Sequence, residues 1–147
     1  MKIYVSPYWM DAVWAPIAEG NKVDDLLRAD MSLKKNFDLL VNQYLIPYFH
    51  SELLPENQVK PNVLLRIKES WRYGMNYYTE KELERAFDRN LPPFSIPSDV
   101  RQFYIHVWQA VFPNEFYKLK DKSLYHDLKD TVQVGPWQWL EHKTRLI

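Results

Sequence analysis

Residues 62–87 read NVLLRIKESWRYGMNYYTEKELERAF, and they contain the clearest structural signals in the chain. Apolar side chains recur there at spacings of three and four, the period of one helix face. One stripe consists of Val63, Ile67, Trp71, Gly74 and Tyr78, and a neighbouring stripe of Arg66, Ser70, Tyr73 and Tyr77. Thr79 then precedes Glu82 by three residues, the spacing of a capping box in which each side chain bonds the other's backbone N–H. This pattern predicts a helix from Asn62, a break at Thr79, and a second helix that ends before Pro92 and Pro93.

Toward the C-terminus, a further helix is predicted to begin at Pro97 and Ser98 and to end at Pro113, which cannot continue the hydrogen-bond ladder. Its apolar face consists of Val100, Tyr104, Val107, Trp108 and Val111. Beyond Asn114 the periodicity weakens, and only short helical turns are predicted around residues 116–119 and 125–128. Residues 131–134 are predicted to form a short strand.

Toward the N-terminus, Ser32 is predicted to cap a helix that Pro47 kinks or ends. Its apolar face consists of Leu33, Phe37, Leu40, Val41, Tyr44 and Tyr48. Asn21 is predicted to cap a shorter helix, on whose surface Asp24 and Arg28 have the spacing of an ion pair. Residues 1–20 are expected to be irregular apart from a strand at residues 3–5, because Pro7 and Pro16 interrupt regular elements.

These segments predict a mostly α fold, with residues 1–147 forming a single compact domain of five or six helices. A small two-stranded element could pair the N- and C-terminal segments. In an α+β alternative, residues 3–5 pair with residues 131–134 beside the helices. A chain of 147 residues is long enough to bury roughly 68–70% of the surface that its unfolded form exposes, so one core needs no covalent staples.

The composition excludes several classes of function. The chain has no Cys, which excludes disulfides, thiolate metal sites and Cys nucleophiles. Its 19 basic and 19 acidic residues cancel, and the run Lys118, Lys120 and Lys122 is interleaved with Asp121, which indicates a solvated surface rather than a phosphate track. The longest unbroken apolar run is four residues, far below the roughly 20 of a membrane-spanning helix. We therefore expect a soluble, cytoplasmic protein with no membrane partner.

Motifs for catalysis and for cofactor binding are missing from the sequence. The three isolated Gly residues form neither a dinucleotide fingerprint nor a phosphate loop, and no Gly-x-Ser-x-Gly elbow is present. The four His residues are too far apart for a metalloprotease helix, and His106 is expected on the surface. We predict no metal, no cofactor and no catalytic residue, although an enzyme with an unrecognised carboxylate or His site remains the first alternative.

Aromatic residues are the unusual feature, at 16% of the chain. Trp, Tyr and Arg are the residue types that dominate protein interfaces. The candidate partner-binding residues form two groups: Arg66, Tyr73 and Tyr77 on one helix flank, and Tyr8, Trp9, Trp14, Trp137 and Trp139 near the termini. The leading hypothesis is therefore a small bacterial-type protein that acts by binding another protein, as an inhibitor, an immunity protein or an adaptor does, or that forms a homodimer. A second alternative, a nucleic-acid-binding module, requires five arginines to converge on one face: Arg66, Arg72, Arg85, Arg89 and Arg101.

Overall fold

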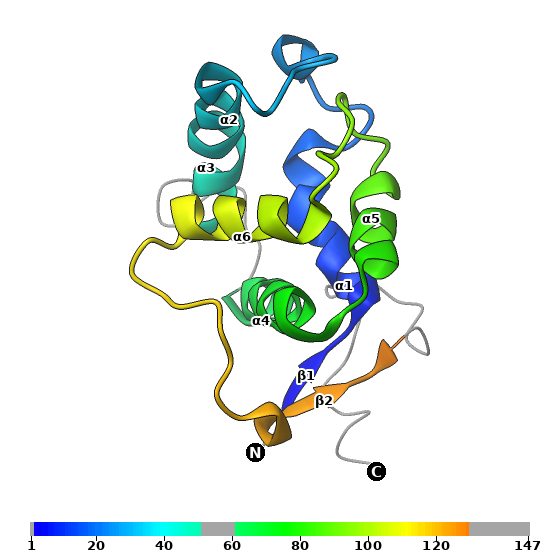
Figure 1. The fold of residues 1–147 in the computed structure, drawn as a ribbon, viewed down its shortest axis with the longest axis vertical. Coiled ribbons are helices and arrows are strands. Elements are labelled where there is room, and N and C mark those ends of the chain that lie inside the picture. Colours follow the sequence, from blue (N-terminus) through cyan, green and yellow to red (C-terminus); the bar gives the residue numbers. More distant parts are fainter. Residues whose placement is uncertain (1, 51–60, 130–147) are drawn as a thin grey trace.

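The computed structural model describes residues 2–50 and 61–129, and it confirms the prediction of a mostly α fold with a small two-stranded element (Figure 1). Its α-helices are α1 (Pro7–Met10), α2 (Lys34–Leu39), α3 (Ile46–Phe49), α4 (Pro61–Tyr77), α5 (Glu80–Asp88) and α6 (Val100–Val111). Shorter 3-10 turns are η1 (Asp11–Ile17), η2 (Asp24–Leu26) and η5 (Lys122–Leu124), and η3 (Leu40–Leu45) is a π-helical turn. The strands are β1 (Ile3–Val5) and β2 (Tyr125–Asp127). Among these elements, no helix has the length and apolar character needed to cross a lipid bilayer.

The N-terminal segment is helical, so the expectation of irregular structure there was wrong. The Ser6 hydroxyl caps α1 by accepting a hydrogen bond from the Tyr8 N–H. Pro7 occupies the first turn, where its missing N–H costs nothing because that group has no intrahelical partner anyway. Pro16 lies inside η1, which follows α1 without a gap. Neither Pro7, at the start of α1, nor Pro16, inside η1, therefore interrupts the helical structure as predicted.

The core is centred on tryptophan and tyrosine side chains that come from distant parts of the sequence. Trp14 is fully buried and packs edge-on against Phe87 and Tyr104, with ring centroids 5.1 and 5.3 Å away. Its indole N–H donates to the Tyr104 hydroxyl (3.0 Å), which donates to the Leu83 carbonyl (2.6 Å). This chain of bonds joins η1, α6 and α5, and it satisfies polar groups that would be costly to bury alone.

The predicted apolar stripes of α4 and α6 face this core. Val63, Ile67, Trp71 and Tyr78 are buried, as is the whole predicted face of α6. The capping box is confirmed: the Thr79 N–H donates to Glu82 Oε1 (2.9 Å), and the Glu82 N–H donates to Thr79 Oγ1 (3.1 Å). The α6 helix begins at Val100 rather than at Pro97, because the Asp99 side chain supplies its cap.

The helix predicted from Ser32 to Tyr48 is present as α2, η3 and α3 in succession, but Ser32 does not cap it. The Ser32 N–H and hydroxyl both donate to Asp30 Oδ1, and Leu33 is the N-cap residue. Pro47 explains the π-helical turn before it, since a proline ring inside a helix removes one hydrogen bond and crowds the preceding turn. As predicted, the helix ends soon after Pro47, at Phe49.

The segment between η1 and α2 contains only one 3-10 turn instead of the predicted helix. Asn21 does not cap that turn, because its amide donates to the carbonyls of Ala15 and Pro16 at the end of η1. Arg28 follows η2 in the left-handed conformation (φ 56°), which takes it out of register with Asp24. The predicted ion pair between Asp24 and Arg28 is therefore wrong.

The C-terminal part of the described chain also differs from the prediction. The helical turns expected at residues 116–119 and 125–128 are absent: the first segment is extended, and the second contains β2. The predicted strand at residues 3–5 is confirmed as β1, and its partner is β2, in parallel register with Ile3 opposite Tyr125. The strand predicted at residues 131–134 lies outside the described residues.

Candidate protein-binding surface

The structure separates the residues that the sequence nominated for partner binding. Trp9, Trp14 and Tyr73 are buried, with Tyr73 only 5% exposed, so they belong to the core and offer no surface to a partner. Tyr8 is half-buried on α1, where the Arg89 guanidinium lies 5.3 Å from its ring.

Tyr77 is the only member of the helix-flank group that remains well exposed in the described structure, at 39%. Arg66 is half-buried three turns earlier on α4. Trp137 and Trp139 lie outside the described residues. Only Tyr8, Trp9 and Trp14 of the terminal group are described, and two of these three are buried, so Tyr77 is the starting point for a surface.

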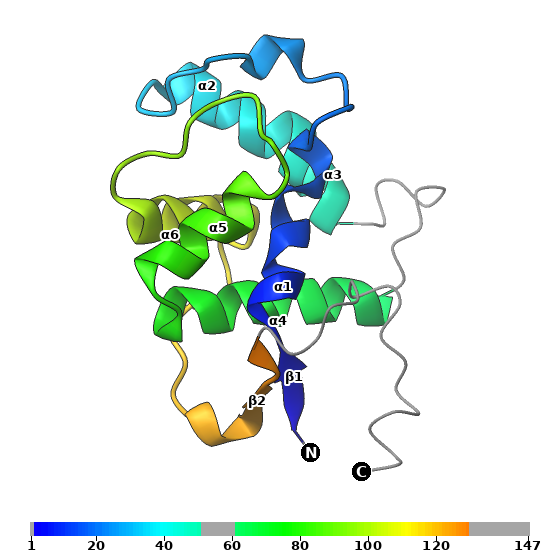
Figure 2. The same ribbon diagram turned by 90° about the vertical axis from the view of Figure 1, so that its right-hand side faces the viewer.

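A segment in which the sequence nominated no binding residue lies beside Tyr77. After α6 ends, the chain turns at residues 113–115 and then runs extended through residues 116–119, past α4 toward η5, as two views at right angles show (Figures 1 and 2). Glu115 attaches the start of this segment to α4: Lys68 Nζ donates to both of its carboxylate oxygens (2.7 and 2.8 Å), and Arg72 Nη2 to one (3.2 Å). The Trp108 indole N–H donates to the Glu115 carbonyl (2.9 Å). The segment is thus fixed where it leaves the core.

Asn76, one turn further along α4, holds the middle of the segment by its side-chain amide. Its Nδ2 donates to the Tyr117 carbonyl (2.7 Å), and its Oδ1 accepts from the Leu119 N–H (3.2 Å). One amide thereby bonds the peptide groups on both sides of Lys118, as a neighbouring strand would. This pairing explains why the segment is extended although no strand lies beside it.

Exposure alternates along the segment with the period of a strand. Tyr117 and Leu119 turn inward and are half-buried, whereas Phe116, Lys118 and Lys120 turn outward. Phe116 is 91% exposed, the most of any large apolar side chain in the described residues. We name the outward surface the aromatic–lysine face, and it comprises Tyr77, Phe116, Lys118, Lys120, Lys122 and Leu124.

Asp121 caps η5 at the far end of the aromatic–lysine face. Asp121 accepts hydrogen bonds from the Ser123 N–H (3.0 Å) and hydroxyl (2.5 Å), and these bonds lower the pKa of its carboxyl group. Lys122 places its ammonium group 4.7 Å from the Tyr77 ring centroid, a cation–π distance. Leu124 follows at 49% exposure.

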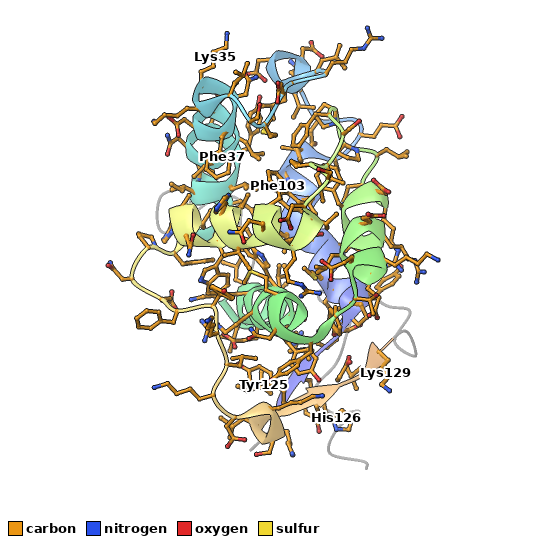
Figure 3. All side chains as sticks on the ribbon, in the orientation of Figure 1. Lys35, Phe37, Phe103, Tyr125, His126 and Lys129 are labelled. Atoms are coloured by element: carbon orange, nitrogen blue, oxygen red, sulfur yellow. The ribbon has the colours of Figure 1, made fainter. Side chains whose placement is uncertain are left out.

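Behind the face, tyrosine hydroxyls bond to carboxylates. Figure 3 shows Tyr125 between β2 and α4, where its hydroxyl donates to Glu69 (2.5 Å). The Tyr78 hydroxyl donates to Asp127 (2.9 Å). Burial, followed by the neighbouring carboxylate, raises the pKa of both Tyr78 and Tyr125 well above the ordinary value, so both phenols stay protonated donors. Hydrogen bonds from tyrosine hydroxyls to carboxylates therefore support the face from behind.

The charge of the aromatic–lysine face is positive. Lys118 and Lys120 have no ion-pair partner among residues 2–50 and 61–129. Of the two carboxylates along the segment, Glu115 is bonded to Lys68 and Arg72, and Asp121 accepts its hydrogen bonds from Ser123. The expectation of a solvated lysine run holds, but the lysines share their surface with an exposed aromatic ring.

The other functional alternatives receive little support from the geometry. Among the described side chains, no group of three or more His, Asp or Glu could hold a metal ion. His106 is exposed, as expected. Three of the five arginines required for a nucleic-acid surface bind carboxylates on different elements: Arg72 binds Glu115, Arg89 binds Asp11, and Arg101 binds Glu80. A guanidinium already paired in this way is poorly placed to bind phosphate.

Comparison with protein-family models, with curated proteins and with solved structures found no match in any of the three. The fold and the surface therefore define a mostly α protein that presents an aromatic and basic face on an anchored, extended segment.

Proposed function

We propose that this protein is a protein-binding module whose partner docks on the aromatic–lysine face. The observation that carries the proposal is Phe116, a large apolar ring that is almost fully exposed on a segment anchored by several hydrogen bonds. An exposed aromatic ring gains free energy when a partner covers it, and aromatic residues are enriched at interface centres. The inhibitor, immunity-protein and adaptor roles all require such a surface.

The anchoring of the segment favours binding because little order has to be created when a partner arrives. Binding normally costs about 0.5–1.5 kcal/mol for each side chain that becomes immobilised, and more when a loop must be ordered. Here Glu115 and Asn76 already hold the backbone in the extended conformation. The aromatic–lysine face is therefore preorganised before a partner binds.

Charge complementarity indicates the chemistry of the partner. Lys118 and Lys120 project on the same side as Phe116, two residues apart, so the matching surface is acidic and contains a pocket or an apolar side chain for the ring. A second copy of this chain is a poor match, because two basic faces repel each other across a symmetric interface. We propose an acidic protein partner, in the cytoplasm, where a chain without Cys needs no disulfides.

The test is a capture experiment on lysate of the source organism with three immobilised variants, in which every retained protein is quantified. Phe116→Ala removes the ring, and Lys118→Glu with Lys120→Glu reverses the charge. The matched control is Leu27→Ala, which removes another highly exposed apolar side chain, directly after η2. We expect one acidic protein to be retained by the wild type and by Leu27→Ala, and to be lost from both face variants.

Two controls make the result decisive. Thermal unfolding of each variant should match the wild type, since the four changed positions are exposed and contribute little to the core. Retention should fall as salt rises, because the lysine contribution is screened. A partner retained equally by all variants would exclude the aromatic–lysine face, and light scattering that shows a dimer disrupted by Phe116→Ala would replace the acidic partner with a second copy.

A further inference from the structure

A cleft of about 630 Å³ lies at the end of the molecule away from the aromatic–lysine face. Residues 28–32 form one wall, and residues 92–98 form the other. Its floor includes Met31 and Phe94, both of which are buried. A volume of several hundred cubic ångströms is in the range of small-molecule sites.

The two walls are fixed to one another and to the body of the protein. The Arg28 N–H donates to the Pro93 carbonyl (2.7 Å) across the cleft, and the Asn36 amide donates to the Asp30 carbonyl (2.9 Å). Three prolines, Pro92, Pro93 and Pro97, stiffen the second wall. The cleft is therefore preformed.

Each wall begins with a residue in a strained conformation. Arg28 (φ 56°) and Leu91 (φ 47°) are both left-handed although neither is Gly. Such residues cost of order 1–3 kcal/mol each and cluster at ligand-binding sites.

The cleft contains opposite charges that do not neutralise one another. Arg28 and Asp30 both line it, and no ion pair joins them. The bonds from Ser32 use only Oδ1 of Asp30, so Oδ2 is free to accept another donor, and they lower the pKa of the carboxyl group, which keeps it ionised. The hydroxyls of Ser95 and Ser98, also in the lining, have no partner within the described structure.

We propose that this cleft binds a small zwitterion of the α-amino-acid class, with its carboxylate on Arg28, its ammonium group on Asp30, and an apolar side chain against Pro92, Pro93 and Phe94. A guanidinium binds a carboxylate through two parallel hydrogen bonds, and a carboxylate with a free oxygen accepts a hydrogen bond from an ammonium group. A ligand with only one charge leaves the opposite charge of the cleft unmatched. This site is independent of the proposed protein-binding function.

The experiment uses the whole chain and three probes that share one ring: L-phenylalanine, 3-phenylpropanoate without the ammonium group, and phenethylamine without the carboxylate. Binding is followed by the movement of backbone amide NMR signals. We expect L-phenylalanine to shift the signals of residues 28–32 and 94–98 and to bind at least about tenfold more tightly than either half-ligand, as expected for one charge-assisted hydrogen-bonding group.

Two variants separate the roles of the charges. Arg28→Gly removes the guanidinium at a position whose φ Gly adopts freely, so the fold should persist, and binding of L-phenylalanine should fall to the level of phenethylamine. Asp30→Asn keeps an oxygen for Ser32 and should reduce binding to the level of 3-phenylpropanoate. Leu91→Gly relieves the same backbone strain without changing a charge, and it should leave binding within about twofold. Equal binding of the three probes, signals that move elsewhere, or unchanged binding by Arg28→Gly would overturn the proposal.

Discussion

Replacing Asn76 with Ala should release the extended segment from α4 while leaving the core in place. The change removes three hydrogen bonds: two to the segment, at the Tyr117 carbonyl and the Leu119 N–H, and one to the Arg72 carbonyl within α4. At about 0.5–1.5 kcal/mol each, the two bonds that hold the segment contribute about 1–3 kcal/mol to the free energy of unfolding. Ala is a better helix former than Asn by up to about 0.7 kcal/mol, which offsets part of that loss. The expected net destabilisation is therefore about 0.5–2.5 kcal/mol.

Two assays measure the effect of Asn76→Ala. Thermal unfolding should show a midpoint lower by about 1–9 °C, given about 2–4 °C per kcal/mol for a chain of this size. Amide hydrogen exchange at Leu119 should accelerate by about tenfold for each 1.4 kcal/mol of local stability lost, while amides of the α6 core face keep their protection. The matched control is Gln109→Ala, which removes an exposed amide side chain from α6 and should change neither quantity.

The same variant tests the reasoning behind the proposed surface. If the segment were held by its own backbone preference, Asn76→Ala would leave Leu119 exchange unchanged, and the role assigned to the Asn76 amide would be refuted. If exchange accelerates and partner binding weakens while Phe116 is intact, the order imposed by Asn76 contributes to affinity.

Three further results are expected. Thr79→Ala should cost about 0.5–2 kcal/mol by removing the cap of α5, and an unchanged urea midpoint would contradict the capping box. Gly74→Ala should lower the free energy of unfolding by up to about 2 kcal/mol. The new Cβ would lie 2.7 Å from Met10 Sδ and 2.9 Å from Tyr78 Cδ2, so overpacking outweighs the gain in helix propensity. A Gly74→Ala variant more stable than the wild type would show that the Met10 and Tyr78 side chains move aside at little cost. The free energy of unfolding should fall as pH rises above about 10. Burial raises the pKa of Tyr78 and Tyr104 in the folded protein, so the unfolded chain loses those protons first. A urea midpoint that stays constant from pH 8 to pH 11 would contradict this expectation.

The helices of the core were predictable because local and tertiary signals agree there. The stripe from Val63 to Tyr78 faces the core in the structure as the periodicity predicts, and Thr79 and Glu82 form the capping box that their spacing predicts. Such signals depend on residues within two turns of one another, so the sequence alone reveals them. The errors near the N-terminus have a local cause as well: Pro7 was read as a breaker when its position after Ser6 suits a first helical turn.

The aromatic–lysine face was not predictable in the same way, although its signal is visible once the structure is known. Residues 116–120 alternate between outward and inward side chains, which is the period of a strand. The alternation is too short to outweigh three apolar residues at near-helical spacing, and no second strand in the sequence marks a partner for it. The partner is instead the side chain of Asn76, 41 residues from Tyr117, which bonds two peptide groups from the surface of a helix. Because one distant side chain decides this backbone conformation, the periodic trace in the sequence is short. For that reason the most exposed aromatic ring among the described residues lies in a segment for which the sequence predicts a helical turn.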